Sequence, residues 1–480
     1  MTASGAISGV TTLTLASVGG TATLSADVDV TTLAVGNTVA NVVFTGNGSS
    51  VTDAISFAND GTLTLGQDGG TQTYNGGLTT TSVGGTVTLN GTIATSNDAI
   101  VFGAVTLGAN TIVDTNATNG TGDITLAAVT GGNNTLTLTT ENNIAGADIT
   151  ASGAIAGVTT LTLASVGGTA TLSADVDVTT LSVNNTVANV VFTGNGSSVV
   201  NAVAFANDGT LTLGQDGGTQ TYNGGLTTTS VGGTVTLNGS IVTSNDAVVL
   251  GAVTLGNNVT IDTNATDGTG DITIAAVTGG NNTLTLTTEN NIANADITAS
   301  GAIAGVTTLT LANVGGTATL SADVDVTTLS VNNTVANVVF SGNGSSVTNA
   351  VSFANDGTLT LGTSGGTQTY NGGLTTTSVG GTVTLNGTIA SSDDAITLGA
   401  VTLGSATIID TNSTTTNRAD ITIAAVTGGT NTLTLTTENN VTGSDVTASG
   451  NISGVTTLTL ANVGGTATLS ADVDVTTLSV

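Results

Sequence analysis

The chain of 480 residues contains no Cys, His, Pro, Trp or Lys, and its single basic side chain is Arg418. Nucleophilic catalysis by a Ser–His or Cys–His pair needs an imidazole base, a phosphate-binding loop needs a lysine, and zinc sites need His or Cys ligands. These three classes of function are therefore excluded. Without Cys there are no disulfides, so cysteine usage says nothing about the redox compartment.

Positive charge is almost absent as well. The 31 Asp and Glu residues face one Arg, which gives a net charge of −30, and only 7% of the residues are charged. Neutralising phosphates needs Lys and Arg, so the composition excludes nucleic acid as a partner and disfavours docking on anionic lipid. No run of about 18 apolar residues is present. We therefore expect no membrane insertion by this segment and no signal peptide in the residues after Met1.

Aromatic residues make up 2% of the chain, but 38% of its residues are hydrophobic. Disordered chains lack the apolar surface that offsets the entropy of ordering, so a folded chain is favoured over a disordered one.

The chain repeats itself. The sequence Thr2-Ala3-Ser4-Gly5 returns at intervals of 148, 148 and 149 residues. We define repeats 2–149, 150–297 and 298–446 and a partial repeat 447–480, with the extra residue of the third repeat inside Thr411–Ala419. Both ends lie within the repeat pattern, which predicts an excerpt of a longer array.

Each repeat consists of short alternating segments separated by turn signals. Thr12–Leu15, Thr62–Leu65 and Thr135–Leu138 alternate Thr with Leu, the period-two pattern of a half-buried strand. Glycine pairs and Asn-Gly dipeptides between such segments supply the positive φ angles that tight turns require. No helical period is sustained, so the sequence predicts an all-β chain.

A β-solenoid fits this pattern better than the other all-β architectures. Tandem sandwiches would repeat near 100 residues around bulky aromatic cores, propellers near 40–50 residues, and a transmembrane barrel needs aromatic girdles. In a solenoid, stacked coils align like residues into ladders, and each inner coil both donates and accepts backbone hydrogen bonds, which a proline cannot do. We predict a right-handed parallel β-helix built from tandem superrepeats of ~148 residues. At roughly 20–24 residues per coil it would hold about 20–24 coils and extend on the order of 100–115 Å.

The segment Gly-Ala-Val-Thr-Leu-Gly (103–108) is followed by Asn-Thr-Ile-Val-Asp-Thr (110–115) and Gly-Asp-Ile-Thr-Leu (122–126). This texture resembles the large bacterial β-strand-repeat surface proteins, which are filamentous haemagglutinin-like β-solenoid adhesins. The resemblance covers the whole chain in style. It implies a secreted β-helix used for adhesion, aggregation or a cell-surface coat. No secretion domain or receptor-binding motif accompanies it.

Two acidic patterns recur. Asp27 and Asp29 return in each later repeat, and at i, i+2 spacing on a strand their carboxylates would share a face about 7 Å apart. A solvated outer face explains them. A cation-bridging face and the carboxylate pair of a carbohydrate-active β-helix enzyme are the alternatives.

The candidates for calcium are the oxygen ligands of a glycine-rich loop in the first two repeats. A plain turn is the alternative, and in the third repeat Arg418 places a cation among the corresponding ligands. The candidate ligands are Asp114, Asn116, Asp123, Asp262, Asn264, Asp267 and Asp271.

Near-identical duplication adds length and avidity, and an enzyme gains little from it. We therefore expect an extracellular, cell-surface structural or adhesive rod that is not an enzyme and has no cofactor other than weakly bound Ca²⁺. Its expected partners are copies of itself or matrix components. The alternatives are a Thr-ladder surface that binds ice or glycans, and a surface-layer protein with Ca²⁺-bridged acidic faces.

Overall fold

The computed structural model describes residues 1–414 and 418–480. These residues form 48 β-strands and no helix. The chain divides into two compact units, Met1–Asn238 and Gly239–Val480. Each unit is described by itself.

The strands of the first unit are β1 (Thr2–Ala3), β2 (Ile7–Leu15), β3 (Thr21–Leu24), β4 (Val28–Val35), β5 (Asn41–Phe44), β6 (Ser50–Val51), β7 (Ile55–Ser56), β8 (Leu63–Leu65), β9 (Thr71–Tyr74), β10 (Leu78–Thr79), β11 (Val87–Ala94), β12 (Ile100–Phe102), β13 (Val105–Asp114), β14 (Ile124–Leu126), β15 (Val129–Thr130), β16 (Thr135–Thr139), β17 (Ile149–Ala151), β18 (Ile155–Ala164), β19 (Thr169–Leu172), β20 (Val176–Val183), β21 (Asn189–Phe192), β22 (Ser198–Val199), β23 (Val203–Ala204), β24 (Leu211–Leu213), β25 (Thr219–Tyr222) and β26 (Leu226–Thr227). Strand β27 (Val235–Val242) contains the boundary between the units.

The strands of the second unit are β28 (Val248–Asp262), β29 (Ile272–Thr278), β30 (Thr283–Thr287), β31 (Ile297–Ala299), β32 (Ile303–Ala312), β33 (Thr317–Leu320), β34 (Val324–Val331), β35 (Asn337–Phe340), β36 (Ser346–Val347), β37 (Val351–Ser352), β38 (Leu359–Leu361), β39 (Thr367–Tyr370), β40 (Leu374–Thr375), β41 (Val383–Ser391), β42 (Ile396–Asp410), β43 (Ile421–Thr427), β44 (Thr432–Thr436), β45 (Val446–Ala448), β46 (Ile452–Ala461), β47 (Ala467–Leu469) and β48 (Val473–Ser479).

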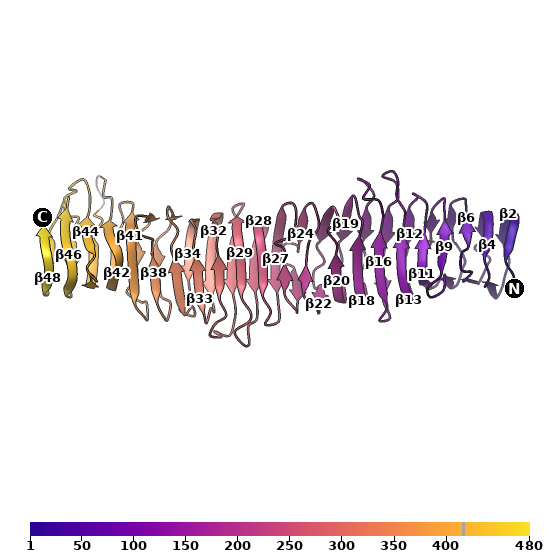
Figure 1. Ribbon diagram of the computed structural model, residues 1–480, viewed down its shortest axis with the longest axis horizontal. Helices are drawn as coiled ribbons and strands as arrows, with labels where there is room; N and C mark the ends of the chain where they lie inside the picture. The colour runs from indigo at the N-terminus through magenta and orange to yellow at the C-terminus, as the bar shows by residue number, and fades with distance from the viewer. Residues whose placement is uncertain (415–417) are drawn as a thin grey trace. The chain divides into compact units, whose positions relative to one another are not determined.

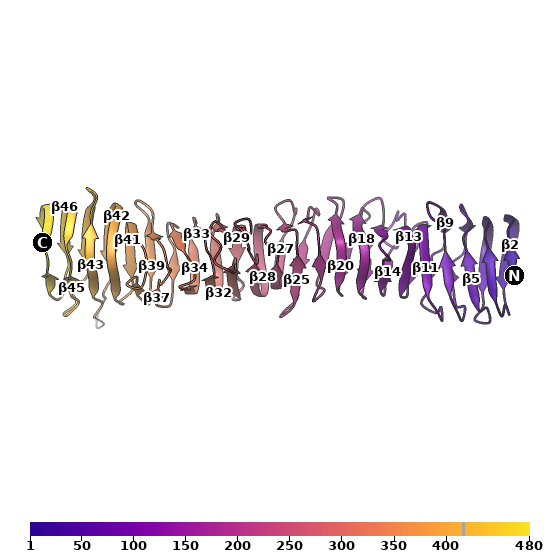
Figure 2. The same cartoon turned by 90° about the horizontal axis from the view of Figure 1, so that it is seen from below.

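Within each unit the chain winds in stacked coils (Figures 1 and 2). The strand pairings run along the stack in three parallel columns, which we treat as three sheets. In the first unit we name them sheet A, which begins β1–β3–β5–β8, sheet B, which contains β4–β6–β9, and sheet C, which contains β7–β10–β12–β14. Every pairing is parallel and joins one coil to the next. The predicted all-β solenoid of stacked parallel strands is confirmed.

Coil length varies more widely than the sequence analysis predicted. The coil that leads from Thr2 to its partner Thr23 falls within the predicted range. The coil from Leu89 to its partner Leu107 is shorter than that range, and the coil from Thr130 to its partner Ala156 is longer. The difference arises in the connections between strands and in β-bulges that shift the register within a pair, as between β11 and β13 after Leu89.

The interior is a column of aliphatic side chains. Along the strands, buried Leu, Val and Ile alternate with partly exposed Thr, as in the buried–intermediate–buried pattern of Leu63–Leu65. The aromatic residues that recur in the sequence lie inside the column. Tyr74 packs edge-on against Phe44, with ring centroids 6.3 Å apart, and against Phe57 at 6.4 Å.

Glycines with positive φ let one long strand turn from one sheet into the next. Gly9 (φ 73°) lies within β2, and the register between β2 and β4 shifts there, between Ile7 and Val10. Gly91 (φ 66°) has the same role in β11, at a register shift after Leu89. A β-bulge with a left-handed glycine bends its strand, so these residues form corners of the solenoid.

Asparagine side chains at other turns bond along the stack. The Asn41 Oδ1 accepts a hydrogen bond of 2.9 Å from the backbone N–H of Thr62, and the Asn47 Oδ1 accepts one of 3.0 Å from that of Thr71. These bonds join each turn to the coil above it.

Candidate functional site

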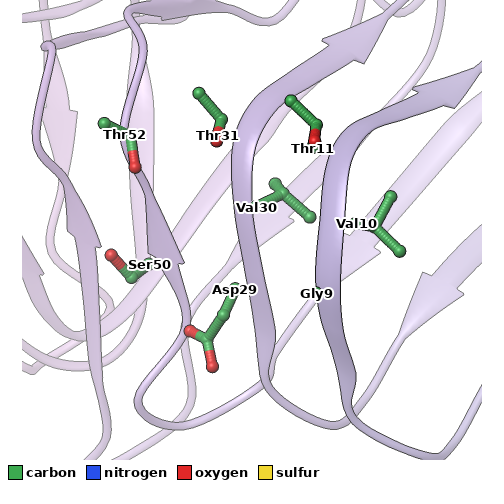
Figure 3. A pocket seen from close by; sticks show the side chains of 8 residues that line it. All are labelled: Gly9, Val10, Thr11, Asp29, Val30, Thr31, Ser50 and Thr52. Carbon is green, nitrogen blue, oxygen red and sulfur yellow. The ribbon is translucent and has the colours of Figure 1, made fainter.

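A shallow groove opens at the corner where Gly9 bends β2 (Figure 3). Three successive coils line it, and its volume is about 560 Å³. Thr11, Thr31 and Thr52 lie at one end of the groove, with Asp29 towards the other. Val10 and Val30 lie between them.

The same groove recurs once in each repeat. Its counterparts form around Gly157, Gly305 and Gly454, with volumes of about 370, 400 and 390 Å³. Each contains the aspartate equivalent to Asp29, and none of the lining residues is cationic. The Asp177 Oδ1 accepts a hydrogen bond of 3.1 Å from the Ser198 backbone N–H. Hydroxyl groups and one carboxylate favour a polar ligand that donates hydrogen bonds.

The two aspartates of the Asp27–Asp29 pattern have different surroundings. Asp29 is exposed on β4 and lines the groove. Asp27 precedes β4, is partly buried, and lies against the turn at Gly48. The groove therefore contains one of the two carboxylates.

In the first calcium-candidate loop, the acidic side chains bind backbone groups. Asp114 ends β13, and its Oδ1 accepts a 2.8 Å hydrogen bond from the Asn116 backbone N–H. Asn116 itself is left-handed, with φ 49°. The Asp123 Oδ1 accepts a 2.9 Å bond from the backbone N–H of Asp148 in the next coil. These bonds fix the turn and tie it to the coil above.

The second loop repeats this arrangement. Asp262 accepts a bond of 2.9 Å from the Asn264 backbone N–H, and Asp271 accepts one of 2.8 Å from that of Asp296. The exposed Asp267 accepts a 2.7 Å bond from the Thr269 hydroxyl. Hydrogen bonds from Asn245 and Thr269 lower the pKa of the Asp267 carboxyl.

No three Asp, Glu, His or Cys side chains gather into a metal-binding group in residues 1–414 and 418–480. Part of the third loop, residues 415–417 within the predicted insertion, lies outside the described residues. In the described part, Arg418 lies beside Gly443.

The only three glutamates of the chain lie close to these loops, and the sequence analysis did not single them out. Glu141 is an acidic neighbour of Asp114, Glu289 of Asp262, and Glu438 of Asp410. Burial, and then the glutamate charge, raise the pKa of each of these aspartates, while the backbone bond to each opposes the rise. The signal in the sequence was the exclusive occurrence of Glu in a Thr-Glu-Asn-Asn segment.

A second group that the sequence analysis passed over lies in the core. Gln72 is buried beside Tyr74, and its Oε1 accepts a 2.9 Å hydrogen bond from the tyrosine hydroxyl. Its Nε2 donates to the carbonyl oxygens of Phe44 and Gly46. The pairs Gln220–Tyr222 and Gln368–Tyr370 repeat this bond. These groups stabilise the interior and do not reach the groove.

Among the residues that the structure describes there is no helix long and apolar enough to cross a membrane. No protein-family model, curated protein or solved structure matches the chain.

Proposed function

We propose that this chain is a segment of an extracellular structural and adhesive rod, in which stacked coils provide length and the repeated groove provides contact sites. The observation that carries the proposal is the recurrence of one groove with one aspartate in each near-identical repeat. Repetition of a site raises avidity without any new contact.

The interior supports a mechanical role. It is a packed column of Leu, Val, Ile and Phe, and each coil is joined to the next by backbone hydrogen bonds. In such a repeat protein, contacts are made between neighbouring coils, so length can grow without a new core. The proposed partners are further copies of the chain or matrix components, and the proposed place of action is the cell surface. We propose no catalytic role.

Small-angle scattering tests the rod. About 22 coils at ~4.8 Å per coil give a length near 105 Å and a radius of gyration of about 30 Å. A globular protein of the same length would have a radius of gyration of about 23 Å. A value near the lower figure contradicts the rod.

A second candidate function rests on the Thr ladders. Four outward-facing threonines stack directly in sheet A, namely Thr64, Thr88, Thr106 and Thr130. Regular rows of hydroxyl and methyl groups could order water or bind a glycan. Thermal hysteresis measures the ice-binding form of this function, and a freezing point equal to that of buffer removes it.

Calcium bridging of the acidic faces remains part of the proposal in a reduced form. The Asp114–Glu141 and Asp262–Glu289 neighbours place two carboxyl groups in adjacent coils. A cation between such coils would relieve their repulsion. The comparison of Ca²⁺ and EDTA given in the Discussion tests it.

A further inference from the structure

The number of coils in a repeat is not an integer. Seven coils up sheet A, starting from Thr2, the chain arrives at Ala156. The residues of that column, each paired with the next, are Thr2, Thr23, Val43, Thr64, Thr88, Thr106, Thr130 and Ala156. The sequence repeat returns earlier, at Thr150 in β17, whereas Ala156 lies in β18. The repeat therefore ends one strand short of seven coils.

The residue equivalent to Thr2 in the second repeat lies in another sheet. Thr150 pairs with Thr125, and that column continues down through Val101 to Thr79, which is sheet C. Because each coil passes through three sheets, one repeat corresponds to 6⅔ coils. At ~4.8 Å per coil it advances about 32 Å along the axis.

The second unit shows the same shift within itself. Starting from Thr298, seven coils lead to Ser453 in β46. Thr447, the residue equivalent to Thr298, lies in β45, which belongs to the column of Thr422 and Thr397. Each unit therefore moves a repeated feature by one sheet per repeat.

We propose that the solenoid displays its repeated surfaces in rotation about its axis, so that they meet separate partners on different sides instead of one partner lying along one face. The groove at Gly9 lies at the corner between sheets B and C, because β4 pairs with β6 and then contacts β7. The groove at Gly157 lies at the corner between sheets A and B, because β18 pairs first with β15 and then with β16. This deepens the proposed function and rests on it.

The Thr ladder follows the same rule. In sheet A the ladder from Thr64 to Thr130 is followed by Ala156 and Asp177. Its counterpart in the second repeat begins with Thr212 and Thr236, which lie in the column of Thr150, in sheet C. No sheet of the first unit carries the same ladder in both repeats. A flat lattice lying along one sheet of this unit would therefore meet the ladder of one repeat only.

Cysteine cross-linking tests the register directly, because the chain contains no cysteine of its own. Thr125→Cys with Thr150→Cys places two thiols on directly paired residues, and we expect a disulfide or a short bis-thiosulfonate bridge. Thr130→Cys with Thr150→Cys is the matched control. An arrangement of exactly seven coils per repeat would pair these two residues, so a bridge in the control and none in the first variant overturns the proposal.

The second unit offers an independent copy of the test. Thr273→Cys with Thr298→Cys should form the bridge, and Thr278→Cys with Thr298→Cys should not, because Thr278 pairs with Ala304. These bridges depend on local register. A compact particle in scattering would contradict the rod and leave them unchanged, so the two proposals fail separately.

The display itself is tested by counting bound probes. A hapten on cysteines at positions 29 and 177 would face two corners, whereas one at positions 29 and 164 would face one side, because Ala164 lies six coils directly above Asp29. A globular monovalent probe of about 400 residues is roughly 55 Å across, wider than the ~29 Å between the same-side haptens. We expect two probes on the 29/177 variant and one on the 29/164 variant by mass photometry. One probe on both variants overturns the proposal.

Discussion

Alkaline pH tests the burial of the three tyrosines of this chain. Above pH 9 the only side chains that can lose a proton are Tyr74, Tyr222 and Tyr370, because Lys and Cys are absent and Arg418 stays charged. All three rings have no exposed surface, and burial raises the pKa of each phenol well above its ordinary value of about 10. Each folded-state hydroxyl is therefore held neutral as a hydrogen-bond donor to a buried glutamine.

The magnitude follows from the difference between folded and unfolded pKa. Since the folded pKa is raised, the stabilisation is fully present below pH 10 and is lost as the pH rises above it. An unfolded tyrosine with a pKa near 10 favours unfolding by about 1.4 kcal/mol at pH 11 and about 2.7 kcal/mol at pH 12. Three rings that unfold together would remove about 8 kcal/mol at pH 12.

Urea unfolding at pH 9, 10, 11 and 12, followed by circular dichroism, measures this loss, and absorbance at 295 nm follows tyrosinate in the same samples. Tyrosinate should form only with loss of the β signal. The matched control is the triple variant Tyr74→Phe, Tyr222→Phe and Tyr370→Phe. Its free energy of unfolding should not change between pH 9 and 12. Ionisation near pH 10 with the β signal intact would refute the burial argument.

Three further outcomes are expected. Gly153→Ala should destabilise the chain by about 1–3 kcal/mol or more, because the new Cβ would lie 1.6 Å from the Ala127 carbonyl oxygen. The equivalent Gly5→Ala, whose Cβ would have no atom within 4 Å, should be near neutral in urea unfolding. Equal effects of the two substitutions would contradict the packing. Asp114→Asn should be at least as stable as the parent at pH 7 in urea unfolding, because burial raises the pKa of the Asp114 carboxyl above its ordinary value of 3.8. The stabilising contribution of the protonated carboxyl is fully present only below that ordinary value and is lost as the pH rises, so the difference should shrink as the pH falls below about 3. Lower stability of the variant at pH 7 would contradict this. Millimolar Ca²⁺ should raise the melting temperature more than NaCl of equal ionic strength, with reversal by EDTA, and equal curves would remove cation bridging.

Much of the architecture could be predicted because its causes are local. Alternating Thr and Leu define the strands, and Gly9 and Gly91 occur where the corners form. Pairing partners could not be predicted, because coil length is not constant: the coil from Leu89 to Leu107 is much shorter than the coil from Thr130 to Ala156. Register depends on how much of the chain each connection takes up, and a period-two pattern carries no information about that.

Less of the candidate site could be predicted from the sequence. The loop spacing indicated oxygen ligands, but it could not show that the Asp123 carboxylate accepts the Asp148 N–H of the following coil. The groove itself consists of residues from three coils, and no motif in one segment marks it. The Gln72–Tyr74 bond, in contrast, was within reach, because period two places these residues on the same buried face.

A repeat of 6⅔ coils also constrains how the array can change length. Each repeat begins one sheet away from the sheet in which the previous repeat began. Equivalent strands therefore keep equivalent neighbours in the stack only if whole repeats are added or removed. Ile149–Ala151 stacks on Ile124–Leu126, and Ile297–Ala299 stacks on the equivalent Ile272–Ile274. Deletion of residues 150–297 would place Thr298 after Ile149 and give its strand the neighbours that Thr150 has now. We therefore expect the shortened chain to keep its β signal and a urea midpoint close to that of the parent. Loss of that signal would show that the repeats are not interchangeable, and the rotating display would then lack its structural basis.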